Sequence, residues 1–317
     1  MRILRLVILM VAWCVAYASA QTARQASHMV PTGKGWAEEN YDSPAITQPT
    51  TGTVTTGNGI SYHGGPIMPG TVNIYYIWYG NWSNGPQPSD SASTVTLLEA
   101  LAGPSGLNGS DYAKINSTYS DNNANVTGKA VLQGTTTDNY SHGTKLRDVS
   151  VQDVVASAIS SGSLPQDPNG VYFVLTSSDV NETSGFCKKY CGWHTHATIN
   201  NVDIKYAFVG NTDRCPLACE QQTNSPNGNS GADGMASVLA HELEEAISDP
   251  DLNAWYDSSG LENADKCAWK FGPTQTTASG AQYNQTLAGY NWLIQMNWEN
   301  RRGGGCAQIL GGTFYTY

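Results

Sequence analysis

The chain has 317 residues, of which 40% are hydrophobic, enough for one large domain or two small ones with a sizeable core. Its formal net charge of -10 at pH 7 argues against nucleic acid or an anionic membrane surface as a partner. Ten acidic residues lie between Cys215 and Asp265, without a Lys or Arg among them. A segment with this charge is expected to attract a cation.

Residues 1–20 have the features of a signal peptide. Arg2 and Arg5 precede the apolar run LVILMVAWCVAYA, and the small residues Ala-Ser-Ala follow. We expect cleavage before Gln21 and a secreted, extracellular protein with a net charge of 14 minus 26, or -12. No later stretch reaches the roughly 20 apolar residues of a membrane span. Residues 21–60, rich in Thr, Gly, Ser and Asn, predict a flexible polar leader before one domain at 61–317.

Regular elements alternate along this domain. Segments rich in β-branched and aromatic residues, or with alternating polarity, predict strands at 71–79, 170–177, 204–210 and 290–298. Helical spacing of apolar residues predicts helices at 91–101 and 149–159, with Ser150 as a candidate N-cap of the second. Residues 108–139 contain frequent Gly and Asn, which favours short strands and loops. These elements predict a single α+β domain with a mixed β-sheet packed by helices.

A further helix is expected from Asp233, a suitable N-cap, to the residue before Pro250. It places His241 and Glu245 one turn apart on its polar face, with Glu242 at the border of that face. This is the zinc-binding His-Glu-x-x-His pattern with the last His replaced by Glu, so it predicts a zincin-like metal-site helix. The alternative is an ordinary amphipathic helix with a solvated polar face.

A catalytic zinc needs three protein ligands and one open position, so a third ligand must come from elsewhere. Glu262 and Asp265 follow Glu245 by seventeen and twenty residues. We favour Glu262 as the ligand and Asp265 as the carboxylate that orients His241, because ligating imidazoles usually donate their second N–H. Glu242 is then the general base.

His194 and His196 are two further metal-binding candidates, because alternate residues of a strand point the same way. The simpler interpretation is that they are two histidines beside a disulfide-bound loop.

Six cysteines remain after the signal peptide, and an even number in an exported protein predicts disulfides, although the sequence does not choose the pairing. They are Cys187, Cys191, Cys215, Cys219, Cys267 and Cys306. The alternative is a structural zinc held by the two Cys-x3-Cys pairs.

A series of motifs along the domain resembles the EXORDIUM (phosphate-induced protein) family. The resemblance covers residues 61–306 and implies a secreted protein of the plant apoplast or cell wall, associated with cell expansion, without fixing a biochemical activity. Its motifs are Tyr62-His63-Gly64-Gly65-Pro66, Ile77-Trp78-Tyr79-Gly80, Tyr140-Ser141-His142-Gly143, Leu175-Thr176-Ser177, 187–194, Gly234-Met235, His241-Glu242-Leu243, Asn253-Ala254-Trp255-Tyr256 and 262–267.

Three functions are consistent with these features. The favoured one is a zinc-dependent hydrolase acting on an extracellular peptide. The second is a non-catalytic module stabilised by Ca2+ or zinc, in which Asp249, Asp251, Asn253 and Asp257 imitate a calcium loop without its central Gly and final Glu. The third is a carbohydrate or cell-wall polymer binder that uses exposed Trp and Tyr with paired carboxylates; Trp78 and Trp292, however, are more simply core residues.

Overall fold

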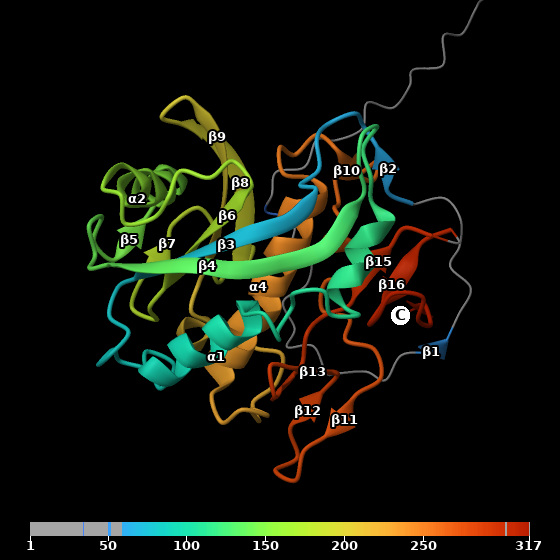
Figure 1. Ribbon diagram of the computed structural model, residues 1–317. Helices are drawn as coiled ribbons and strands as arrows, with labels where there is room; N and C mark the ends of the chain where they lie inside the picture. The colour runs from blue at the N-terminus through green and yellow to red at the C-terminus, as the bar shows by residue number, and fades with distance from the viewer. Residues whose placement is uncertain (1–33, 35–49, 52–58, 302, 317) are drawn as a thin grey trace, which may run out of the picture.

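The computed structural model describes Lys34 and residues 50–51, 59–301 and 303–316. The predicted signal peptide at 1–20 and most of the predicted leader at 21–60 lie outside the described residues. The rest forms the mixed α and β architecture that the sequence predicts (Figure 1).

A five-stranded mixed sheet forms the centre of the molecule, in the order β4-β3-β6-β9-β8. The first four strands of this order pair in parallel, and β8 closes one edge by pairing antiparallel to β9. The bounds are β3 (Gly70–Tyr79), β4 (Val126–Asp138), β6 (Gly170–Thr176), β8 (Gly192–Ile199) and β9 (Val202–Val209). The central strands β3 and β6 are buried nearly throughout because helices cover both faces of the sheet.

The prediction of short strands and loops over 108–139 is wrong. The segment contains a 3-10 helix, η1 (Ala113–Thr118), and then the thirteen-residue strand β4. Because β4 is an edge strand, polar residues occupy its exposed positions, and its pairing with β3 continues beyond register shifts next to Gly128 and Gly134. The glycines that favoured loops therefore lie within a continuous strand.

Helices lie on both faces of the sheet (Figure 1). Helix α1 (Ala92–Ala102) packs on α4 (Ser230–Ser248), which also contacts β8 and β9, whereas α2 (Asp148–Ser160) packs on β6 and β9 from the other side. The helices predicted at 91–101 and 149–159 are thereby confirmed. Ser150 is not the N-cap of α2, because Arg147 takes that position and Ser150 accepts its backbone N–H at 3.2 Å.

Short strands dominate the chain after α4. Four small pairings form here: β10 with β2, β11 with β12, β13 with β14, and a sheet of β1, β17, β16 and β15. Their bounds are β1 (Thr50–Thr51), β2 (Ser61–Tyr62), β10 (Trp255–Tyr256), β11 (Gln275–Thr276), β12 (Gln282–Tyr283), β13 (Gln285–Leu287), β14 (Tyr290–Trp292), β15 (Asn297–Glu299), β16 (Gly305–Ala307) and β17 (Tyr315–Thr316). The remaining elements are β5 (Lys145–Leu146), β7 (Asn181–Glu182), η2 (Thr212–Arg214), α3 (Pro216–Cys219) and η3 (Asp265–Cys267).

The single strand predicted at 290–298 is in fact two strands, β14 and β15, in different sheets. The chain between them leaves the β-ladder to approach α4, where the backbone N–H of Gln295 donates to Ser237 Oγ at 3.2 Å. This detour interrupts the strand and carries the Gln295 side chain toward the polar face of α4.

All six cysteines predicted to form disulfides do so. The pairs are Cys187–Cys215, Cys191–Cys219 and Cys267–Cys306. The alternative of a zinc held by the Cys-x3-Cys pairs is therefore wrong. The first two bonds tie the chain before β8 to the loop before α4, and the third ties η3 to β16.

The aromatic side chains mainly fill the core. Trp78 is 3% exposed and Trp292 is fully buried, as predicted, and none of the described Trp or Tyr residues belongs to the exposed class. In the part of the chain that the structure describes, the Trp and Tyr side chains are therefore buried or only partly exposed. Within the same residues, no helix is both long and apolar enough to cross a bilayer.

Candidate metal centre

Helix α4 carries the His-Glu-x-x-Glu residues and starts earlier than predicted. Its N-cap is Asn229, whose side chain accepts the backbone N–H of Ala232 at 3.0 Å. The prediction of Asp233 as N-cap is wrong, because its carboxylate accepts bonds from Ser225 and from Asn227 Nδ2 instead. The predicted end of the helix before Pro250 is confirmed.

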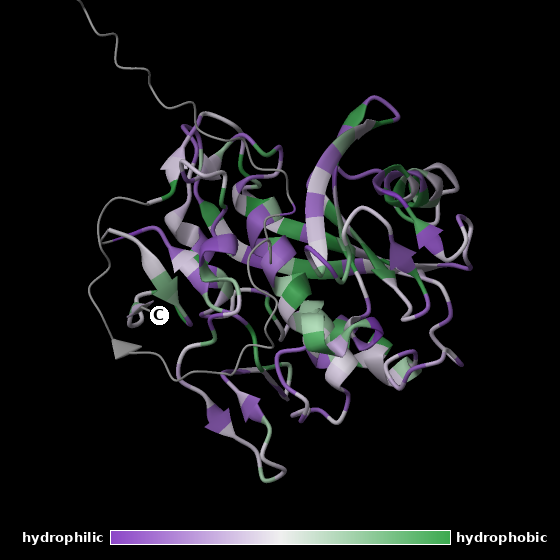
Figure 2. Cartoon of the chain, turned by 180° about the vertical axis from the view of Figure 1, so that it is seen from behind, coloured by the Kyte–Doolittle hydropathy of each residue, from purple (hydrophilic) through white to green (hydrophobic). Residues whose placement is uncertain are grey.

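The polar face of α4 is buried, so the alternative of a solvated amphipathic helix is wrong. His241, Glu242, Glu244 and Glu245 are each about 1% exposed. Figure 2 shows this hydrophilic stretch of the helix inside a largely hydrophobic centre. Burying several ionisable groups together is costly unless they are paired or bind a metal.

His241 and Glu245 contact each other across one turn of α4. The distance from His241 Nε2 to Glu245 Oε1 is 3.0 Å, and Glu245 Oε2 lies 3.7 Å from Nε2 of His194. Both carboxylate oxygens of Glu245 thus face an imidazole nitrogen. Glu245 is the residue shared by two groups whose ligand atoms lie within 4.8 Å of one another.

Those two groups are His241, Glu242 and Glu245 from α4, and His194, Glu245 and Glu262 from three different segments. His194 comes from β8, which contacts α4, and its Nε2 lies 3.2 Å from both carboxylate oxygens of Glu262. His196 does not join it, because its Nδ1 lies 2.8 Å from Asp203 and 3.7 Å from Asp251. The two histidines of β8 therefore belong to different clusters.

Glu262 and Asp265, the two downstream carboxylates, both reach the cluster. Asp265 Oδ1 lies 3.5 Å from His241 Nε2, the nitrogen that also faces Glu245. Its other oxygen accepts the backbone N–H of Glu262 at 3.1 Å, and its own N–H donates to Glu245 Oε1 at 3.0 Å. Asp265 thus holds the segment of Glu262 against α4.

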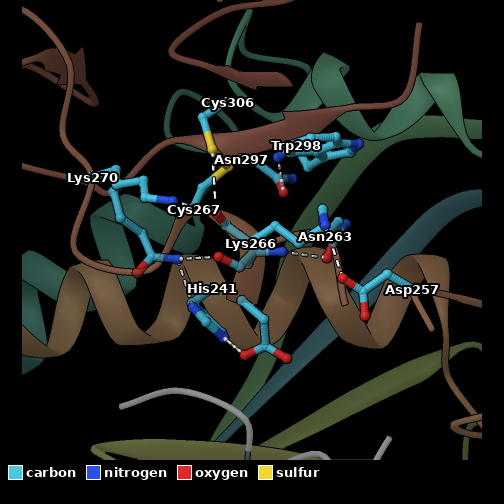
Figure 3. The surroundings of a disulfide bond; sticks show 12 residues. His241, Asp257, Asn263, Lys266, Cys267, Lys270, Asn297, Trp298 and Cys306 are labelled. Atoms are coloured by element: carbon cyan, nitrogen blue, oxygen red, sulfur yellow. Dashed lines mark hydrogen bonds and ion pairs between the residues drawn. A yellow bond between two sulfur atoms is a disulfide. The ribbon is translucent and has the colours of Figure 1, made fainter. Parts of the chain in front are cut away.

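We predicted that a carboxylate contacts the second ring nitrogen of His241, but Gln295 lies there instead. Its Nε2 lies 2.6 Å from His241 Nδ1 and donates to the carbonyl of Ala264 at 3.2 Å. Figure 3 shows His241 just below the segment held by the Cys267–Cys306 disulfide. No sequence signal marks Gln295, because only the break between β14 and β15 brings it here.

Several polar atoms of the cluster are buried and have no hydrogen-bond partner in the described part of the chain. They include both carboxylate oxygens of Glu242, Oδ1 of Asp265 and Nδ1 of His194. Glu242 lies against the backbone of β8, since a Cβ atom built on Gly192 would lie 3.0 Å from Glu242 Oε1. Orphaned buried atoms on ligand-type side chains are the chemistry expected of residues that hold a cation and a water molecule.

Apart from its imidazoles, the cluster has no basic side chain among the described residues that offsets its charge. Within the described part of the chain, no Lys or Arg forms an ion pair with Glu242, Glu245, Glu262 or Asp265. Burial and the neighbouring Asp265 raise the pKa of Glu245 to about 7, and burial raises the pKa of Glu242 and Glu262 well above the usual range. Burial lowers the pKa of His194 to about 3. Burial lowers the pKa of His241, but the combined charges and hydrogen bonds of Glu245, Asp265 and Glu242 outweigh burial and raise this pKa well above its usual range.

The outer carboxylates of the acidic segment have other partners. Asp257 pairs with Lys266 at 2.9 Å and Asp251 with Lys205 at 3.5 Å, both lysines lying outside the segment (Figure 3 shows the first pair). Asp249 accepts the backbone N–H groups of Asn253 and Ala254. The four residues of the suggested calcium loop therefore do not converge on one site.

Three carboxyl groups near α4, two of them buried and one partly buried, make stability depend on pH. Burial raises the pKa of Asp233 to about 6, of Asp249 to about 7 and of Glu220 to about 8. In the unfolded chain these groups titrate near about 4, so between these values the folded state binds more protons. We expect the free energy of unfolding in chelator to fall as the pH rises from about 5 to about 8, measured by urea unfolding. Asp249→Asn should make the curve flatter, and a free energy that rises with pH would contradict this assignment.

Comparison with known proteins places the chain in a family. Residues 60–306 match the conserved region of phosphate-induced protein 1, so the chain belongs to the EXORDIUM (phosphate-induced protein) family. It is 37% identical to EXORDIUM-like 5 of Arabidopsis thaliana, over 62% of this chain and 59% of that protein. It is 33% identical to EXORDIUM-like 3 of the same plant, over 76% of this chain and 80% of the relative. It is also 28% identical to PHOSPHATE-INDUCED 1 of Nicotiana tabacum, over 66% of this chain and 71% of that protein.

The aligned region thus spans less than two thirds of EXORDIUM-like 5. No solved structure is significantly similar to the chain.

Proposed function

We propose that this protein is an extracellular metal-dependent hydrolase with a zincin-like helix, in which Glu242 is the general base. The observation that carries the proposal is the carboxylate of Glu242: it is buried beside His241 and Glu245, and neither oxygen has a hydrogen-bond partner among the residues that the structure describes. A structural glutamate at this depth is normally satisfied by hydrogen bonds. An unsatisfied one next to a set of metal ligands is suited to bind and deprotonate a water molecule.

The proposed ligands are His241 and Glu245 from α4 together with His194 and Glu262. Their donor atoms come from three segments, and Glu245 lies between the two imidazoles. Imidazole nitrogens and carboxylate oxygens are the donors that zinc binds in catalytic sites. Asp265 lies at the margin of this set, and Gln295 holds the imidazole of His241 in place.

A divalent cation bound by these residues would polarise a substrate carbonyl and make a water molecule more acidic. Glu242 would take the proton of that water and pass it to the leaving group. Two carboxylate ligands bring more negative charge than the His2Glu set of familiar zinc peptidases, which weakens Lewis acidity. We therefore propose a slower hydrolase, with a peptide as the substrate class.

The action outside the cell is supported by the signal-peptide pattern at 1–20 and by three disulfides, which persist in oxidising compartments.

A second candidate function is favoured by the burial of the site. His194, His241, Glu245 and Glu262 are at most about 1% exposed, which suits a structural cation in a non-catalytic module of the cell wall. Such a module needs the ligands but not an unpaired Glu242. The two candidates therefore differ in what Glu242 does.

The direct test of the proposal is metal removal and return. The secreted protein should hydrolyse an unstructured protein substrate such as casein, lose that activity in a chelator and regain it with zinc. The structural cation would instead be supported by two results together. The protein would show no metal-dependent hydrolysis before treatment, and the chelator would lower its unfolding temperature.

A further inference from the structure

Lys34, from the N-terminal segment, contacts a part of the domain far from it in sequence. Its Nζ lies 2.6 Å from Asp148 Oδ2, at the start of α2, and donates to Ser184 Oγ at 2.8 Å. The side chain of Lys34 is 22% exposed and that of Asp148 51%. In the sequence, Lys34 lies 114 positions from Asp148 and 150 positions from Ser184. The contact is therefore tertiary and not a local turn.

Two aromatic rings complete the surroundings of the ammonium group. Nζ lies 5.4 Å from the ring centroid of Tyr190 and 5.1 Å from that of Trp193. Both residues are about 1% exposed. An ammonium group at this distance is attracted by the electron-rich face of an aromatic ring. A carboxylate, a hydroxyl and two ring faces thus surround one cation.

Hydrogen bonds hold these groups in place independently of Lys34. Ser184 Oγ donates to Asp148 Oδ1 at 2.7 Å and contacts Glu182 Oε2 at 2.9 Å. The backbone N–H of Ser184 reaches both oxygens of Glu182 at 3.0 Å, and the Tyr190 hydroxyl donates to Glu182. Because Glu182 is buried, this network fixes the loop after β7. The site is therefore preorganised and carries net negative charge when no cation is bound.

We infer that Asp148, Ser184, Tyr190 and Trp193 form a binding site for a primary alkylammonium group, here called the lysine cradle, which Lys34 occupies in the intact chain. The cradle anchors Lys34 to the domain. Consecutive residues of a strand point to opposite faces, so Trp193 lies on the other face of β8 from His194. The anchor is thus separate from the candidate metal centre and does not depend on the proposed hydrolysis.

Trace acetylation of the native protein tests the occupant of the cradle. Only a free amine reacts with the reagent, so Lys34 should be acetylated slowly relative to the exposed Lys145 and Lys188, as read by peptide mass spectrometry. Asp148→Asn should raise the rate at Lys34 about two- to fivefold, because it removes the partly exposed ion pair that holds the amine. Asp153→Asn is the matched control: it removes the same charge from an exposed position of α2 and should leave the rate unchanged.

A second arm tests the site itself. In the Lys34→Ala variant, Nα-acetyl-lysine methylamide should bind and shift the NMR signals of the Trp193 indole, whereas the uncharged norleucine analogue should not. The intact chain should bind neither, because its own lysine competes at a high effective concentration. Equal acetylation of Lys34 in wild type and Asp148→Asn, or no difference between the two ligands with Lys34→Ala, would overturn the proposal.

Discussion

Replacing Glu242 with Gln is expected to lower the rate of hydrolysis by about 10²–10⁴-fold, the usual contribution of a general base. Glutamine keeps the shape of the side chain but cannot take a proton. Because His241, Glu245, Glu262 and His194 remain, the metal content of the variant should equal that of the wild type. The measurement is the initial rate of substrate cleavage together with metal content on the same samples.

Glu244→Gln is the matched control for this prediction. Glu244 lies two residues away on the same helix and is equally buried, but its carboxyl group accepts a hydrogen bond from Asn297 Nδ2 at 3.3 Å. Burial raises its pKa well above the usual range, which favours the neutral form, and glutamine has the same shape as that form. Its variant should keep full activity. Unchanged hydrolysis in Glu242→Gln would remove Glu242 from the mechanism and leave the structural cation as the better account.

Loss of the Cys267–Cys306 disulfide should have the second large effect. The bond closes a loop with a sequence separation of 39, and the chain-entropy relation gives about 4 kcal/mol of stability for a loop of this size. Cys267 is the last residue of η3, which begins at Asp265, three residues after Glu262 (Figure 3). The double variant Cys267→Ser/Cys306→Ser should therefore lose both stability, measured by urea unfolding, and metal affinity, measured by competition with a coloured chelator.

The control is Cys187→Ser/Cys215→Ser. The neighbouring Cys191–Cys219 bond has the same sequence separation of 28, so it still constrains nearly the same stretch of chain and the loss of stability should be smaller. Neither Cys187 nor Cys215 lies beside a proposed ligand. If both double variants bound metal equally well, the disulfide at Cys267 would have no part in positioning Glu262.

Sequence patterns were sufficient for the elements whose signal is local. The strands β3 and β6 follow from runs rich in β-branched and aromatic residues, and the end of α4 follows from its periodicity and Pro250. The start of α4 could not be read in this way, because Asp233 is a good N-cap residue that bonds to the preceding loop instead. Strand β4 was missed for a related reason: an edge strand with one exposed face can contain the residues typical of loops.

The candidate site likewise contains some residues that local sequence patterns predict and others that they do not. The spacing of His241, Glu242 and Glu245 depends only on the helix, and the downstream pair Glu262 and Asp265 was found from the composition of the segment. The position of His194 opposite Glu262 depends on how β8 packs on α4, and alternation along the strand could show only that it shares a face with His196. Gln295 depends on a break between two strands that no local pattern indicates.

The central proposal is a divalent cation held by His241, Glu245, His194 and Glu262. Elemental analysis of the purified secreted protein tests it most directly. We expect about one equivalent of zinc or another divalent metal per chain, as a single site of this kind holds. The variants His241→Ala and Glu245→Ala should lose it, while Glu242→Gln keeps it. A wild-type protein that remains metal-free after incubation with zinc, or variants that retain the metal in full, would contradict the proposed centre.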